Sequence, residues 1–450
     1  MLSGAFPAAA QGIYKTNVNT ENSIVRVWQD RDVVIYNEES PGKGAFLLYT
    51  VGATSAQHIN LPIDISVKDF EIMDDEIWFC GDSTGTTLPG GKCGVVGTFN
   101  IPNTFAGADI INYAVMGIWF SQPNYVLYIS GLERLDLFQI GNYTVMAMTG
   151  DCYIHQSLVR KRSTVVSVIL NGTQWNVSAL RDVDSTAVYT DIAALDNVVT
   201  AVGTSVDGTG LIAKSFYKSI SFPNSPTTPN YGDSIVCSSP IGKALITHLS
   251  DDEAAVVQLD EKGRTLLHML EFSTGNAIPT APTRVTDDPY YLYNSEWNLN
   301  EIRYSPLTDN ISVLEYGILP GSNVFETLLW SFPRIAWHPT LVPVQPMSTV
   351  RQASMDVDID NHPVTVGKLL GSGNLDVQSY AAYTGYYSPP MAPLLEWDDC
   401  VDYEEIEYLE EYPTVLRVFV NDNESSDSFN NREYQPQVSE IIFTQICGKE

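Results

Sequence analysis

One residue pattern recurs along the chain and restricts the folds available to it. Each of its clearer copies has an alternating segment, a turn containing Asp, an apolar run and a second turn. Around Asp74-Asp75 it reads KDFEIMDDEIWFCGDSTG. Period-two alternation interrupted by such turns indicates antiparallel hairpins in series. The clearer copies begin at Lys68, Thr190, Lys243, Asn300 and Ser354, and looser ones at Ser23, Leu132 and Glu404.

The spacing of these copies, roughly 45 to 65 residues, is typical of four-stranded blades with variable loops. No segment of helical periodicity separates them, so an alternating α/β fold is excluded. The sequence predicts an all-β fold, a single β-propeller of four-stranded antiparallel blades over residues 1–450. Eight copies predict eight blades, with seven as the alternative. Residues 1–22 are expected to contribute to ring closure, which removes exposed sheet edges.

Composition restricts the partners. The 450 residues carry a formal net charge of -30, which argues against nucleic-acid binding because a phosphate backbone needs Lys and Arg opposite it. The one compact basic cluster, 160–162, is too small to offset this charge. No apolar run reaches the roughly 18 residues of a membrane-spanning helix.

The stretch GDSTGTTLPGGKCG, residues 81–94, resembles two catalytic motifs without matching either. A phosphate-binding loop requires G-x-x-x-x-G-K-[ST] before a helix. Here Gly85 lies one residue too far from Gly91, and Cys93 replaces the hydroxyl. The G-x-S-x-G around Ser83 is followed by another strand pattern, whereas a nucleophile elbow enters a helix. We interpret the stretch as a hairpin turn, and no catalytic residue is predicted.

Six cysteines are compatible with either redox compartment. Cys80 and Cys93 flank the predicted hairpin loop, which could bring them together as a disulfide. Cys400 and Cys447 both fall in the last copy and form a second candidate pair. No C-x-x-C occurs, and the six histidines are scattered, so no metal site is predicted from these residue types.

The segment DVDIDN offers a weak calcium candidate through Asp356, Asp358 and Asp360. Asn361 occupies the sixth position, where a calcium loop needs glycine, and Gly367 stands at the twelfth in place of glutamate. The alternation of these aspartates favours a solvated strand face. We therefore expect no cofactor, with calcium as the alternative.

Several aromatic residues lie between the copies and are candidate ligand contacts. In YTGYYSPP the glycine and prolines place tyrosines on a loop, from which they could stack on a sugar or anchor a protein. Packing between blades is the alternative for each of them. The candidates are Tyr383, Tyr386, Tyr387, Trp337 and Trp297.

The phrase EIWFCGDSTG…GVVGTFNI, within residues 69–101, resembles a motif of β-propeller-like proteins of gut Bacteroidales. The resemblance implies an exported or surface-attached protein, so we expect a location outside the cytoplasm. The start MLSGAFPAAAQGIYK shows neither the charged region and long apolar core of a leader nor a lipid-attachment cysteine. No catalytic residue is implied.

These observations favour a non-catalytic binding scaffold that recognises a glycan or a protein through one propeller face. One alternative is a carbohydrate-active propeller enzyme that uses carboxylates at the central mouth. Another is a structural component of a surface or viral assembly. The residues converging on the central channel would distinguish them, and the oligomeric state is not predicted.

Overall fold

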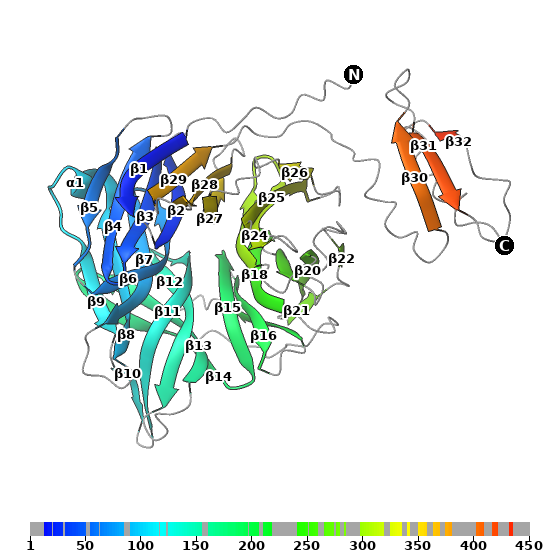
Figure 1. Cartoon of the computed structure of the whole chain (residues 1–450). Helices are drawn as coiled ribbons and strands as arrows, with labels where there is room; N and C mark the ends of the chain where they lie inside the picture. The colour runs from blue at the N-terminus through cyan, green and yellow to red at the C-terminus, as the bar shows by residue number, and fades with distance from the viewer. Residues whose placement is uncertain are drawn as a thin grey trace. The chain divides into compact units, whose positions relative to one another are not determined.

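The computed structural model describes residues 13–379 with gaps, and 402–408, 416–421 and 432–434. Gaps longer than five residues within 13–379 are 85–90, 155–160, 218–240, 285–297, 319–324 and 343–349. Apart from the short helix α1 (Ile101–Phe105), the described elements are β-strands (Figure 1). No helix among these residues is long and apolar enough to cross a membrane. By internal contacts the chain divides into two units, one of them Ala8–Tyr383.

The described strands of this unit form six sheets. The eight-stranded one consists of two antiparallel groups that a single parallel bridge, Lys43 opposite Ile65, joins, so we describe seven successive groups. The first group contains β2 (Asn22–Gln29), β3 (Asp32–Ser40), β4 (Lys43–Thr50) and β5 (Gln57–Asn60), and the second contains β6 (Ile65–Met73), β7 (Glu76–Thr84), β8 (Lys92–Asn100) and β9 (Asn112–Met116). The third group contains β10 (Ile118–Gln122), β11 (Tyr125–Ile140), β12 (Tyr143–Ile154), β13 (Lys161–Asn171) and β14 (Gln174–Asp184). The fourth contains β15 (Ala187–Leu195), β16 (Val198–Ser205) and β17 (Leu211–Tyr217).

The other three groups follow the same plan. The fifth group contains β18 (Ile241–Ser250), β19 (Glu253–Leu259), β20 (Thr265–Ser273), β21 (Asn276–Pro279) and β22 (Thr283–Arg284). The sixth contains β23 (Asn298–Ser305), β24 (Asn310–Ile318), β25 (Phe325–Pro333) and β26 (Thr340–Val342). The seventh contains β27 (Val350–Val357), β28 (Pro363–Leu369), β29 (Asn374–Ser379) and β1 (Ile13–Asn19). β1 pairs antiparallel with β29, with Tyr14 opposite Val377. The N-terminal strand therefore completes a group whose other strands lie more than 300 residues later.

One strand of each group lies toward a common axis, and we call these seven the inner strands: β2, β6, β11, β15, β18, β23 and β27. Each contacts the inner strand of the next group, and β27 contacts β2, so the contacts form a closed cycle. Successive antiparallel sheets arranged in this way define a β-propeller, the fold class that the sequence predicts.

The smaller unit contains a three-stranded sheet of β30 (Asp402–Tyr408), β31 (Leu416–Asn421) and β32 (Arg432–Tyr434). The motif copy that begins at Glu404 falls in this sheet. The number of blades, eight or seven, stays a prediction, as does the assignment of 1–450 to a single domain.

The apolar core lies between neighbouring groups, where inward residues of one sheet face those of the next. Between the first two groups, Phe46 packs against Phe70, Phe79 and Phe99, with ring centroids 5.1 to 5.7 Å apart. A comparable layer between the fifth and sixth groups contains Val257. Because both faces of the strands around these layers are covered, the second strands read as continuous apolar runs in the sequence.

The predicted acidic turns join the inner strands to the second strands of their groups. Asp74, Asp196 and Asp309 stand at these turns with φ values of 56°, 35° and 54°. Asp tolerates this left-handed region better than most residues because its short side chain bonds locally. The first turn of these copies is therefore confirmed.

Five of the inner strands carry β-bulges, which lie near the start of the strand in four of them and at the middle of the longer β11. The register with the second strand shifts between Val67 and Asp69, Leu132 and Arg134, Tyr189 and Asp191, Leu299 and Glu301, and Gln352 and Ser354. A bulge adds one residue to one strand of a pair and redirects its side chain. The simple alternation of the sequence is therefore interrupted at the same place in successive groups.

Glycines on the second strands provide space for three of these bulges. A Cβ on Gly81 would overlap the carbonyl oxygen of Ser66, and one on Gly203 would overlap that of Val188. Gly150 meets the carbonyl of Gly131 in the same way. The glycine that closes the apolar run in these copies thus permits close approach of two backbones.

We expect Gly81→Ala to lower the free energy of unfolding by about 1–3 kcal/mol, because the added methyl must displace backbone. Urea denaturation measures the loss. Gly131→Ala is the matched control, since its Cβ would meet nothing closer than 3.9 Å. Equal stability of the two variants would contradict the steric role assigned to Gly81.

Candidate binding site in the central pocket

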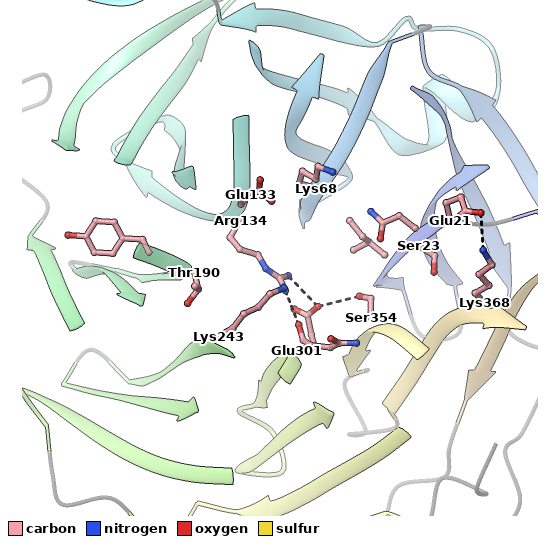
Figure 2. Close-up of a pocket in the computed structure, with 14 residues that line it drawn as sticks. Glu21, Ser23, Lys68, Glu133, Arg134, Thr190, Lys243, Glu301, Ser354 and Lys368 are labelled. Atoms are coloured by element: carbon pink, nitrogen blue, oxygen red, sulfur yellow. Dashed lines mark hydrogen bonds and ion pairs between the residues drawn. The ribbon is translucent and has the colours of Figure 1, made fainter. Parts of the chain in front are cut away.

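A pocket of about 430 Å³ lies where the inner strands converge (Figure 2). Every inner strand contributes to its wall, so the pocket belongs to the propeller as a whole. It is lined by Glu21, Asn22, Ser23, Ile24, Lys68, Glu133, Arg134, Tyr189, Thr190, Lys243, Asn300, Glu301, Ser354 and Lys368.

The bulges of the inner strands direct polar side chains into this pocket. Lys68, Glu133, Thr190 and Asn300 are each the extra residue of a bulge, and each lines the pocket. Lys243 lies in the corresponding irregular stretch of β18, between 241 and 245. We call these five residues the bulge ring. Bulges are common beside functional sites because they re-aim a side chain without ending the strand.

A cluster of charged side chains is buried or half-buried next to the bulge ring, and we call it the axial charge cluster. It consists of Arg26, Asp69, Glu71, Arg134, Glu301, Arg303 and Asp356. Arg26 Nη2 lies 2.6 Å from Asp69 Oδ1, and Arg26 Nε lies 2.9 Å from Glu71 Oε1. Arg303 Nη2 lies 2.9 Å from the same Glu71 oxygen and 3.2 Å from Glu301 Oε1. Guanidiniums and carboxylates from different groups thus neutralise one another at the axis.

Carboxylates of the inner strands also accept hydrogen bonds from the backbone of the next inner strand. Asp69 Oδ2 accepts from Leu135 N at 3.1 Å, and Asp191 Oδ2 from Ile246 N at 2.8 Å. The last inner strand is tied to the first in the same way, because Asp356 Oδ2 accepts from Val27 N at 2.7 Å. These bonds satisfy amides that have no partner in their own sheet at that edge.

The environment separates the pKa values of the axial carboxylates. Burial raises the pKa of Asp136 to about 7, and the nearby charge of Glu71 acts in the same direction. Burial also raises the pKa of Asp191 to about 6, against the attraction of Arg134. Burial would raise the pKa of Glu301 too, but Arg303, Arg26 and Arg134 outweigh it and lower the value to about 2. Glu301 is therefore held in its ionised form.

Two residues of the bulge ring, Glu133 and Lys243, have pKa values shifted in opposite directions. Burial raises the pKa of Glu133, although Lys68 opposes the shift. The positive charge of Arg134, followed by burial, lowers the pKa of Lys243. Both side chains remain accessible to solvent. Shifted groups that face an open pocket are candidates for a functional role.

The aromatic residues predicted as ligand contacts are not among the residues that the structure describes. Tyr383, Tyr386, Tyr387, Trp337 and Trp297 all lie outside the described ranges. Their role stays a prediction.

Of the three aspartates of the calcium candidate, the structure describes Asp356, whereas Asp358 and Asp360 lie outside the described ranges. Asp356 belongs to the axial charge cluster, with Oδ1 3.4 Å from Arg303 Nε and Oδ2 accepting from Val27 N. Its carboxylate therefore faces the propeller axis and a cation. Within the described part of the chain, no cluster of three or more acidic, His or Cys side chains could hold a metal ion.

The structure corrects the expectation of a Cys80–Cys93 disulfide, since both cysteines are free and buried. Cys80 is opposite Val96, whereas Cys93 is opposite Ser83, so the register separates the two by three positions. Because side chains alternate along a strand, this offset also directs them to opposite faces. The stretch 81–84 belongs to β7 itself, and the other candidate pair, Cys400 and Cys447, lies outside the described residues.

Sequence reasoning did not single out the bulge ring, although a signal for it was present. The copies written from Lys68, Thr190, Lys243 and Asn300 each start on a polar residue that the structure places in the pocket. Aligning the copies at this position places polar residues where the alternation of apolar and polar residues along the inner strand is interrupted. Three carboxylates, those of Glu21, Glu133 and Glu301, also line the pocket.

No protein-family model and no curated protein matches the chain. Among solved structures, it is similar to the β-propeller domain of the Trilobed protease from Pyrococcus furiosus, with 6% identity and a TM-score of 0.43 over 84% of this chain and 100% of that one. It is also similar to the K499G mutant of NanB sialidase from Streptococcus pneumoniae (9%, 0.39, 84% and 70%) and to AofleA from Arthrobotrys oligospora (9%, 0.39, 73% and 88%). The β-propeller assignment itself rests on the strand topology described above.

We expect Glu301→Gln to lower the free energy of unfolding by about 3–5 kcal/mol at pH 7, because it leaves buried guanidiniums undercompensated. Glu301 has a folded pKa of about 2, against 4.5 ordinarily, so its charge stabilises the fold above about pH 4.5. This contribution is lost as the pH falls toward 2, and the difference between variant and wild type should shrink accordingly. Urea denaturation at several pH values measures it.

The matched control is Glu253→Gln, which removes the carboxylate of the half-exposed Glu253–Arg334 pair. An ion pair of that exposure contributes about 0–1 kcal/mol. Similar losses for the two variants, or a loss at Glu301 that does not change with pH, would contradict the role of the axial charge cluster.

Proposed function

We propose that this protein is a binding protein whose propeller takes one end of a polar, hydroxyl-rich ligand, such as a glycan, into the central pocket. The observation that carries the proposal is the bulge ring, since five inner strands direct polar side chains at one cavity. Small-molecule sites combine a preformed concavity with a few convergent polar groups.

The chemistry of the bulge ring suits a ligand with many hydroxyl groups. The ammonium groups of Lys68 and Lys243 donate hydrogen bonds, and the carboxylate of Glu133 accepts them. These side chains are carried on paired strands rather than on loops, which supports a fixed geometry. A pocket of about 430 Å³ is in the range of sites for small ligands.

The axial charge cluster supports the same proposal by fixing one side of the pocket. Arg134 and Glu301 belong both to the cluster and to the pocket wall. Arg134 Nη2 donates to Asn300 O at 2.8 Å, and Ser354 Oγ donates to Glu301 Oε2 at 3.3 Å. Groups held in this way lose little freedom when a ligand binds, which favours affinity.

The finer parts of the functional prediction remain proposals. A location outside the cytoplasm and a relation to surface proteins of gut Bacteroidales are supported by the motif within 69–101 alone. The tyrosines of 383–387 are proposed as additional ligand contacts. A role in a larger assembly would use exposed apolar residues, and Ile110, Tyr113 and Val115, which are 90%, 41% and 47% exposed, form such a group in and beside β9.

We expect Lys68→Ala and Glu133→Ala each to weaken ligand binding about tenfold, the effect of losing roughly 1.4 kcal/mol of interaction. A panel of glycans and monosaccharides supplies the ligand, and titration calorimetry measures the affinity. Lys43→Ala and Glu39→Ala are the controls, since both residues are exposed and neither lines the pocket. Binding that the pocket variants leave unchanged would place the site elsewhere.

The second candidate is a carbohydrate-active enzyme, and one observation favours it. Glu133 and Glu301 line the same pocket, and the pKa of Glu133 is raised whereas that of Glu301 is lowered to about 2. Two carboxylates with diverging pKa values are the arrangement that acid and base roles require. In this alternative Glu133 is the general acid, and Glu301 is the ionised partner.

For an enzyme of this kind, Glu133→Gln should reduce kcat on chromogenic glycosides by about 10²–10⁴ with little change in KM, because a general acid contributes that factor. Initial rates across pH 4–8 measure it. Absence of turnover by the wild type on glycosides that it binds would leave the binding role alone.

A further inference from the structure

Two cations from different inner strands line the same part of the pocket (Figure 2). Lys243 on β18 and Arg134 on β11 both line the cavity, and Figure 2 shows their side chains directed to the same place. Lys68 and Lys368 also line the pocket, together with the carboxylates of Glu21, Glu133 and Glu301. Four cations thus gather at one cavity of a chain whose net charge is -30.

Arg134 shares its carboxylate partners with other guanidiniums. Its Nη1 lies 3.5 Å from Glu301 Oε2 and 4.0 Å from Asp69 Oδ2, while Nη2 donates to the carbonyl of Asn300. Glu301 is shared with two other guanidiniums, those of Arg26 and Arg303. Asp69 is likewise shared with Arg26, so Arg134 has no carboxylate partner of its own among the described ion pairs.

Lys243 has less compensation still. Among the described residues, no carboxylate lies within ion-pair distance of its ammonium group, and the side chain is accessible to solvent. Repulsion by Arg134 is the main reason that the pKa of Lys243 is lowered. The charges of Asp191, Glu301 and Glu133 oppose this shift without cancelling it. An anion placed between Lys243 and Arg134 would relieve the repulsion.

We propose that the pocket binds a carboxylate monoanion, with the carboxylate seated between Lys243 and Arg134 and the hydroxyl groups of the ligand directed to the bulge ring. This inference rests on the proposed binding function and names the ligand class for the same site. A monoanion is favoured over a phosphate dianion because Glu133 and Glu301 face the same cavity and repel a second negative charge.

The proposal fixes the direction of the pH dependence. Seating an anion beside Lys243 raises the pKa of its amine, so the complex binds a proton more tightly than the free protein does. Affinity should therefore fall as the pH rises through the lowered pKa of free Lys243. The charged groups that face this amine are Arg134 and Glu133 from β11, Asp191 from β15 and Glu301 from β23.

The test compares D-glucuronate with D-glucuronamide, in which a neutral amide replaces the carboxylate. Titration calorimetry on the full chain at pH 7 and low salt is expected to show binding of glucuronate at least tenfold tighter than that of the amide. Lys243→Gln should remove this preference, so that the two ligands bind with similar affinity, whereas Lys243→Arg should retain it. Lys43→Gln is the control, because Lys43 lies outside the pocket.

A second readout follows the amine directly. After reductive dimethylation with ¹³C, the Lys243 resonance, assigned by its loss in Lys243→Arg, should report a higher pKa when glucuronate is present. This measurement does not depend on the stability of the glutamine variant.

The outcomes separate the two proposals. Equal affinities for glucuronate and the amide, or a preference that survives Lys243→Gln, would overturn the carboxylate site while leaving the pocket a ligand site. Tighter binding of inorganic phosphate than of glucuronate would overturn the choice of a monoanion. Failure of these probes and of the whole glycan panel to bind would overturn the proposed function as well.

Discussion

Charge compensation at the propeller axis is the constraint on which the centre of this molecule depends. Seven inner strands converge there, and each guanidinium or carboxylate they bury would be strongly unfavourable if left alone. Arg26, Arg134 and Arg303 are each within ion-pair distance of Glu301, so one carboxylate connects three strands that are far apart in the sequence. The same geometry that makes burial tolerable also holds one wall of the pocket in place.

The pocket and the fold share a second requirement, which is the bulge. An inner strand with unbroken alternation would send every second residue to the axis, including positions that must pack against neighbouring sheets. The bulge at Lys68 inserts one residue, so that a polar side chain faces the cavity while Val67 and Phe70 remain in the apolar layer. Gly81 opposite the bulge gives its backbone room. A sequence feature that first suggests a turn thus serves the shape of the pocket.

The location of the candidate site also follows from this arrangement. Loop aromatics were the natural sequence candidates, because tyrosines beside glycine and proline stand out in a chain. The described residues place the candidate site at the axis instead. None of the residues there is unusual in the sequence, and only their convergence on one pocket distinguishes them. Lys243 shows the difference, since in the sequence it is an ordinary lysine at the start of a strand. Its lowered pKa arises from Arg134, which is more than a hundred residues away.

The amino-acid sequence by itself determined the all-β class, the repeated hairpins and the turns at Asp74, Asp196 and Asp309, because alternation and turn chemistry are local properties of the chain. It also contained the polar residues at the start of the copies from Lys68, Thr190, Lys243 and Asn300. Only the tertiary structure decided that these residues share one pocket and that Cys80 and Cys93 are three positions out of register. It likewise decided that Asp356 faces Arg303 rather than solvent. Strand register, closure of the ring and the sharing of charge around an axis depend on residues distant in sequence, and a local pattern contains no information about which of them will meet.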